Sequence, residues 1–348
     1  ALFVVCALLL VIYCVCICCM WKAIALGAAI METASDFIGA NKKVVFLPFF
    51  AYLVAFPIII WWTVSAVYIY GLGVAEFKPE AFVASVTASN QSEYLFLYEM
   101  FGMFWLVAWI IAIQIFIVGA VACMWYFSGQ GSDAADGESE NPVGVCIAIK
   151  WAFRYHLGSL AMGAFLVAVI TMIRVIFEYI VYQYEKTEMK DNIVFKCVTC
   201  YVRCILKCLD ACIKFINKNA YIQVALHNRA FCTAAKESFF LMARNAARFN
   251  AVQWTGAILL FIGKLLICTS CAFLTVMLVK AQYPLNEQPL IPAIIVGIFA
   301  YMIASVFLAV FGFSALTILH CFSLDEEQGG SRNTPDGLKK FLDMDPET

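Results

Sequence analysis

Residues 99–127 read EMFGMFWLVAWIIAIQIFIVGAVACMWYF. Its one charged side chain is Glu99, at the first position. A helix crosses the hydrocarbon core of a bilayer with about 20 apolar residues. A strand in a soluble core is usually about five or six residues long. The stretch therefore predicts a transmembrane helix.

Five more runs in the chain are similarly long and apolar. They cover residues 1–21, 45–72, 157–183, 254–280 and 291–320. A membrane β-barrel would instead show segments of about ten residues with alternating polarity. We therefore expect an all-α, polytopic bundle with six clear spans. A transmembrane domain over 1–322 would precede a cytosolic tail over 323–348.

The composition agrees with a membrane protein. The chain is 64% hydrophobic and 14% charged, whereas a soluble domain is about half apolar and a quarter charged. Lipid must therefore replace water around much of the molecule. The net charge of -1 argues against a nucleic-acid partner. Residue 1 lies inside an apolar run, so we expect the chain to lack an N-terminal segment.

Lysine and arginine placement predicts the orientation, because cytosolic loops are enriched in both. The connections around Lys42 and around Arg244 and Arg248 are basic and should be cytosolic. The connection 73–98 should face outside. It contains a sequon that begins at Asn90, so Asn90 is the predicted glycosylation site.

This orientation requires one return crossing between runs 157–183 and 254–280, and the candidate is 196–226. One stripe along that helix would hold Cys197, Cys200, Cys204, Cys208 and Cys212, and the stripe beside it Lys196, Arg203, Lys207, Lys214 and Lys218. Such a helix either lies in the interface or crosses with its basic stripe facing a wet cavity. Zinc is disfavoured, because no second cysteine pair follows at finger spacing. We predict free thiols.

Catalytic and nucleotide-binding signatures are missing from the sequence. There is no G-x-x-x-x-G-K-[ST] phosphate loop. The three histidines, His156, His227 and His320, are far apart and lack metal-ligand spacing. We therefore expect no enzyme activity, no cofactor and no metal.

Charges inside the runs point to function, because each is costly in hydrocarbon unless it is paired or wet. Arg174 and Glu178 lie four positions apart in run 157–183, so we expect them to share a face and pair. Lys264 lies well inside 254–280. These charges either form a structural ion pair or place Glu178 beside a path for a cation.

Tryptophans give the second pointer. Many aromatic residues near span ends belong to the interfacial belt, but Trp105 and Trp109 lie deeper and share one face. Quaternary ammonium ions are recognised by aromatic faces, each worth about 0.5–2 kcal/mol. The alternative is that both rings pack against lipid or a neighbouring helix.

Several long motifs resemble the choline transporter-like family of solute carriers. They are FRYHLGSLA at 153–161, RVIFEY at 174–179, FINKNAYI at 215–222, NRAFC at 228–232, and FIGKLL at 261–266. The agreement runs from about residue 22 to 322.

The resemblance implies about ten transmembrane helices, which supports a crossing at 196–226, and transport of choline without ATP across the plasma membrane or an organellar membrane. It also implies that a first helix and a large extracellular loop are missing. Ethanolamine, thiamine pyrophosphate and a non-transporting membrane scaffold are the alternatives. We expect the substrate site between runs 99–127 and 157–183 and the segment near residue 220, formed by Trp105, Trp109, Tyr155, Glu178, Asn219 and Tyr221.

Overall fold

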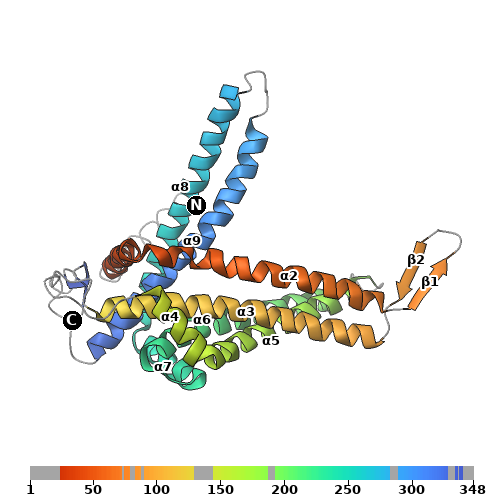
Figure 1. Cartoon of the computed structure of the whole chain (residues 1–348), viewed down its shortest axis with the longest axis horizontal. Helices are drawn as coiled ribbons and strands as arrows, with labels where there is room; N and C mark the ends of the chain where they lie inside the picture. The colour runs from red at the N-terminus through yellow and green to blue at the C-terminus, as the bar shows by residue number, and fades with distance from the viewer. Residues whose placement is uncertain are drawn as a thin grey trace, which may run out of the picture. The chain divides into compact units, whose positions relative to one another are not determined.

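The computed structural model describes residues 24–72, 74–78, 83–87, 90–128, 144–186, 193–282, 289–327, 334–335 and 337–339. Long helices dominate these residues (Figure 1). The chain divides into two compact units. One unit comprises Phe49–Phe116 and Ile149–Ser238, and the other comprises Ala1–Pro48, Ile117–Ala148 and Phe239–Thr348. We call them the pocket unit and the hairpin unit.

Five described helical segments are long and apolar enough to cross a membrane. They are Lys42–Gly71, Gln91–Phe127, Val145–Glu185, Ala246–Gln282 and Leu290–Glu327. Each contains one of the predicted runs, except that Lys42–Gly71 ends one residue before run 45–72 does. The sixth run, 1–21, lies outside the described residues. The all-α, polytopic class is confirmed.

The pocket unit is built on four helices that pack in succession. They are α2 (Leu47–Gly71), α3 (Asn90–Phe127), α5 (Leu157–Glu185) and α6 (Ile193–His227). Trp62 on α2 lies 6.2 Å from Phe96 on α3, measured between ring centroids. A short helix α4 (Val145–Trp151) and a π-helical turn (Ala152–His156) lead into α5.

Helix α3 begins at Asn90, earlier than run 99–127 predicts. Glu93 lies in its first turn, where a negative charge favours the positive end of the helix dipole. Before it, strands β1 (Val74–Lys78) and β2 (Val83–Thr87) pair antiparallel, with Val74 opposite Thr87. The sequence reading of 73–98 as a plain connection missed this hairpin.

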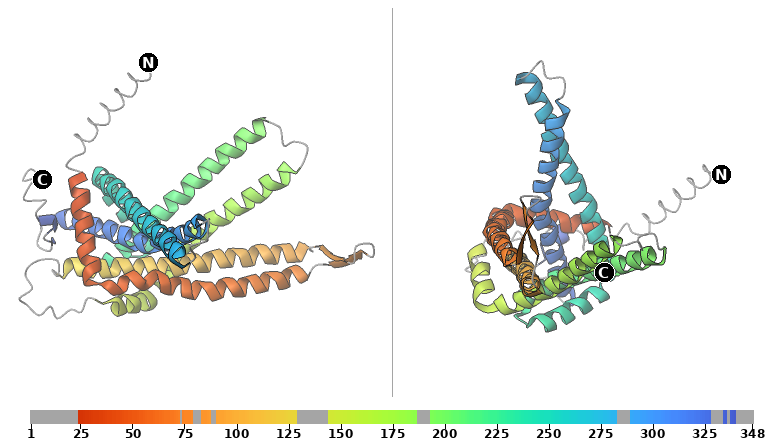
Figure 2. Two further views of the ribbon diagram at one scale, coloured as in Figure 1. Left: turned by 90° about the horizontal axis from the view of Figure 1, so that it is seen from above. Right: turned by 90° about the vertical axis from the view of Figure 1, so that its right-hand side faces the viewer.

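The hairpin unit is dominated by α8 (Ala246–Gln282) and α9 (Leu290–Glu327), which lie side by side (Figures 1 and 2). Small residues let the two helices approach closely, as in membrane bundles generally. A side chain on Gly263 would meet Leu308 at 3.5 Å, and one on Gly297 would meet Cys268 at the same distance.

Residues beyond the predicted run 291–320 also pack in the hairpin unit. Helix α9 continues to Glu327, which accepts two hydrogen bonds from Arg244, at 2.9 and 3.1 Å. These bonds raise the pKa of Arg244 above its ordinary value. Further along, Leu338 is fully buried and the Thr334 hydroxyl donates to Asp325.

Candidate functional site

Helices α5 and α6 form an antiparallel hairpin with contacts along its whole length (Figure 2). From the connected end to the far end, the pairs are Tyr184 with Phe195, Glu178 with Arg203, Arg174 with Asp210, Gly163 with Asn217 and Leu160 with Tyr221. Because α6 follows α5 throughout, it covers the same distance as a helix long enough to cross a bilayer. By composition, however, α6 is not among the five described segments that are apolar enough to cross a membrane, so a crossing at 196–226 stays a prediction.

The prediction that Arg174 pairs with Glu178 is wrong. Arg174 donates instead to Asp210 on α6, at 3.0 Å, and Asp210 also accepts from Lys214 at 2.9 Å. A basic residue placed four positions before an acidic one is the weaker orientation for pairing within a helix. Helix α6 provides a partner for each side chain across the hairpin, so both pair with it.

Glu178 is held by Arg203. The guanidinium donates three hydrogen bonds to the carboxylate, at 2.6, 2.9 and 3.1 Å. Such a two-pronged, charge-assisted contact is among the stronger hydrogen-bonded pairs. About half of the Glu178 side chain remains exposed, so its carboxylate is accessible as well as paired.

At the end of the α5–α6 hairpin away from the connection, two side chains of α6 donate hydrogen bonds to backbone carbonyls of α5. The Asn217 amide donates to the Gly163 carbonyl at 2.7 Å, and the buried Tyr221 hydroxyl donates to the Leu160 carbonyl at 3.5 Å. The fully buried Asn219 donates to Phe215 within its own helix. The side-chain carbonyl oxygens of Asn217 and Asn219 are also buried and accept no hydrogen bond from the described residues.

Helix α3 presents its two tryptophans differently. The Trp105 indole donates to the Ala161 carbonyl on α5 at 3.0 Å, and its ring packs edge-on to Phe165. The Trp109 indole nitrogen is buried and has no hydrogen-bond partner among the described residues. Trp105 therefore helps to join α3 to α5, whereas Trp109 keeps a donor free.

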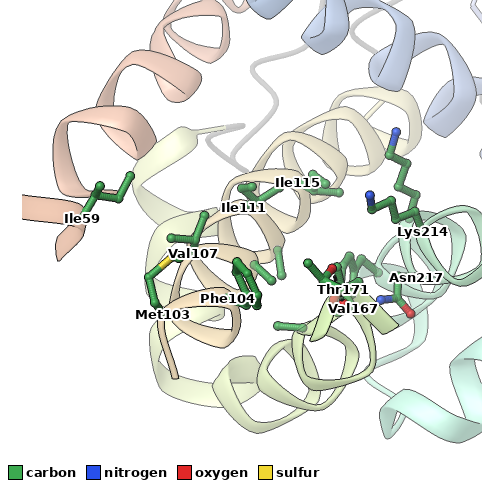
Figure 3. A pocket seen from close by; sticks show the side chains of 15 residues that line it. Ile59, Met103, Phe104, Val107, Ile111, Ile115, Val167, Thr171, Lys214 and Asn217 are labelled. Carbon is green, nitrogen blue, oxygen red and sulfur yellow. Dashed lines mark hydrogen bonds between the residues drawn. The ribbon is translucent and has the colours of Figure 1, made fainter. Parts of the chain in front are cut away.

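A pocket of about 440 Å³ lies in the pocket unit, between α2, α3, α5 and α6 (Figure 3). Its walls are mostly apolar, with Phe104, Val107 and Ile111 on the α3 side. Helix α6 contributes the polar side chains Lys214, Asn217 and Lys218, together with Tyr221. No carboxylate lines this pocket in the described part of the chain.

The structure brings some of the predicted site residues together and leaves others apart. Tyr221 lines the pocket. Trp105 lies at the α3–α5 contact, and Tyr155 is 63% exposed on the π-helical turn. Lys264 belongs to the hairpin unit, where its amine lies 6.0 Å from the centre of the Tyr301 ring. The side chain of Asn90 lies outside the described residues.

Asp210 is the charged residue that sequence reasoning missed. Asp210 is 8% exposed and forms salt bridges with Arg174 and Lys214, near the middle of the α5–α6 hairpin. The sequence did carry a signal, since Asp210 is the one acidic residue within 193–227, among five basic ones. A lone carboxylate in a basic helix indicates a charge partner nearby.

The cysteine stripe of α6 is a continuous exposed face. All five of its thiols are free and exposed. Among the residues that the structure describes, no three potential metal ligands of the His, Cys, Asp and Glu types come together.

Comparison with known proteins gives a consistent result. The family model described as "Plasma-membrane choline transporter" matches residues 4–327. Choline transporter-like protein 1 of Rattus norvegicus is 28% identical over 306 residues, covering 88% of this chain and 45% of the relative. Choline transporter-like protein 2 of Dictyostelium discoideum is 28% identical over 330 residues, covering 93% of this chain and 51% of the relative.

A third relative, choline transporter-like protein 4 of Bos taurus, is 34% identical over 257 residues, covering 71% of this chain and 35% of the relative. The chain thus spans about half the length, or less, of these curated relatives. Together with its apolar helices, this similarity identifies an integral membrane protein. Because the family model matches nearly the whole chain, the chain belongs to the plasma-membrane choline transporter family.

Proposed function

We propose that the protein moves choline or a related small organic cation across a membrane, without ATP. The observation that carries this proposal is the match of the family model to residues 4–327. Relatives named choline transporter-like proteins support choline as the substrate. The plasma membrane is the proposed location, and residues 1–322 form the proposed transporter domain.

The geometry of the pocket unit supports transport over a purely structural role. A scaffold would pack its helices solidly here, whereas a transporter needs a cavity beside the charges in its spans, each of which is costly in hydrocarbon unless it is paired or faces water. Here Arg174, Asp210 and Lys214 form a charged cluster in the middle of a helical hairpin. A pocket of ordinary ligand size adjoins it and includes Lys214 in its wall.

The residues proposed to contact the cation are aromatic faces and one carboxylate. Trp105 and Trp109 would supply the faces, with Tyr155 and Tyr221 as further aromatic groups. Glu178 lies 18 residues along α5 from Leu160, the partner of Tyr221, or about 27 Å at 1.5 Å per residue. It would therefore supply negative charge at another point of the cation's path, where it now pairs with Arg203. Asn219 is fully buried and does not line the pocket, so it would support the site from within α6 without touching the substrate.

Uptake of radiolabelled choline by the full-length protein in reconstituted vesicles tests the proposal. Wild-type protein should accumulate choline above empty vesicles, and unlabelled choline should compete. Glu178→Gln keeps the size of the side chain and removes its charge, so uptake should fall at equal protein abundance. Wild-type vesicles that take up no more choline than empty ones would refute the proposal. Ethanolamine and thiamine pyrophosphate serve as competing substrates in the same assay.

A further inference from the structure

A short piece of the chain beyond α9 packs into the hairpin unit. We call residues 334–335 and 337–339 the tail segment. Thr334 is 1% exposed and Leu338 is fully buried. Pro335 opens a single helical turn, in which its carbonyl accepts a backbone hydrogen bond from Leu338 at 2.9 Å. The buried leucine holds the tail segment in place by apolar contact.

Two contacts join the tail segment to other parts of the same unit. Gly337 packs closely on a helix that precedes α2, since a side chain on Gly337 would lie only 3.1 Å from the Thr33 hydroxyl. The Thr334 hydroxyl donates to the Asp325 carboxylate of α9 at 3.5 Å. The buried Tyr126 hydroxyl of α3 donates to the same carboxylate oxygen at 3.4 Å. The tail segment therefore docks through one apolar side chain and one buried carboxylate.

The Asp325 carboxylate makes this docking sensitive to charge. Asp325 is 9% exposed and forms no salt bridge with the residues that the structure describes. The next two acidic residues of α9 do pair, with Arg248 and Arg244. A second negative charge beside Asp325 would thus meet repulsion that no paired cation offsets. A phosphate group placed next to an acidic residue in a buried contact disrupts that contact.

We propose that Thr334 is a phosphorylation site and that a phosphate there releases the tail segment. Pro335 follows Thr334, and a hydroxyl residue followed by proline is the minimal pattern that proline-directed kinases accept. The Thr334 hydroxyl oxygen attacks the γ-phosphorus of ATP. An O–P bond forms, the bond to ADP breaks, and the hydroxyl proton passes to a base of the kinase.

Burial of Thr334 sets the order of events. The kinase acts on the tail segment during a local opening of the structure, and the added phosphate then prevents docking. The tail is expected in the cytosol, where ATP and kinases are present. Neither Thr334 nor Asp325 lines the pocket of Figure 3. The phosphorylation site is therefore independent of the proposed transport.

Treatment of the purified full-length protein with a mitogen-activated protein kinase, Mg²⁺ and ATP tests the site. Peptide mass spectrometry should place a phosphate on Thr334. Brief trypsin digestion then reports release, because cleavage after Lys339 follows the population of the open segment when opening is fast. The phosphorylated protein should be cleaved there about tenfold faster than the untreated protein. Phosphatase treatment should restore the slow rate.

Three variants separate charge from packing. Thr334→Val accepts no phosphate at this position, so kinase treatment should leave its cleavage rate unchanged. Leu338→Ala should speed cleavage at least about tenfold without any kinase, because it removes the buried side chain. Asp325→Asn removes the neighbouring charge, so phosphorylation should speed cleavage only about threefold.

Four results would each overturn the proposal. They are no phosphate on Thr334 after kinase treatment, an unchanged cleavage rate after phosphorylation, equal acceleration by the kinase in Thr334→Val, and a Leu338→Ala variant that is cleaved no faster than the wild type.

Discussion

At the scale of single residues, the two tryptophans of α3 should have separable roles. Trp109 keeps an unpaired indole donor, whereas Trp105 is fixed to the Ala161 carbonyl of α5. Trp109→Ala should therefore raise the apparent Km for choline several-fold, because losing one aromatic face costs about 1 kcal/mol or more. Trp109→Phe should be milder. Measuring Km separately from surface abundance distinguishes binding from stability.

Trp105→Ala is the comparison for this prediction. It removes a face as well as an interhelical hydrogen bond, so it should lower abundance and also raise Km. An unchanged Km in both alanine variants would show that the rings serve packing alone.

The two acidic residues of the α5–α6 hairpin should also differ. Asp210 is buried and holds two cations, whereas Glu178 holds one and is half exposed. Removing one partner from a buried ion pair costs about 3–5 kcal/mol. Asp210→Asn should therefore destabilise the full-length protein by roughly that amount or somewhat less, because its partners are partly exposed. Glu178→Gln should cost about 1 kcal/mol or less.

Thermal unfolding of both variants in the same detergent checks this order. A larger loss in Glu178→Gln than in Asp210→Asn would contradict the pairing seen in the hairpin.

At the scale of secondary-structure elements, the closeness of α5 and α6 depends on Gly163. A side chain at this position would collide with the Tyr221 hydroxyl, and would lie 2.8 Å from Phe231. The Gly163 carbonyl also accepts the hydrogen bond from Asn217. Gly163→Ala should therefore spread the far end of the hairpin and lower stability by about 1–3 kcal/mol, which is typical of overpacking.

Gly158→Ala is the matched control on the same helix. Nothing lies within 4 Å of a side chain added there, so this variant should be neutral or slightly stabilising. Thermal unfolding of the two variants measures the difference. Similar unfolding midpoints for the two variants would show that the close packing of α5 and α6 does not depend on Gly163.

The apolar runs predicted the long helices because length and hydrophobicity are properties of the chain itself. They could not predict partners across the hairpin. Sequence spacing places Arg174 beside Glu178, and only the packing of α6 against α5 reveals Asp210 and Arg203 as their partners. The pocket is similarly a product of four helices far apart in sequence. Tyr221 was expected at the site and does line the pocket, whereas Lys214 and Lys218 were noted only as a basic stripe.

At the scale of the whole molecule, the orientation in the membrane follows from the two ends of one helical segment. Lys42 is the first residue of the segment Lys42–Gly71. Asn90, the first residue of α3, follows the other end of that segment in the chain, after the β1–β2 hairpin. The basic connection at Lys42 should be cytosolic and Asn90 should be outside. A cysteine placed at Asn90 should react with an impermeant thiol reagent on intact cells, above the background of the native cysteines. Lys42→Cys is the matched control and should react only after permeabilisation. Reaction of both from the same side would mean that this segment does not cross the membrane, and the reversed pattern would invert the orientation.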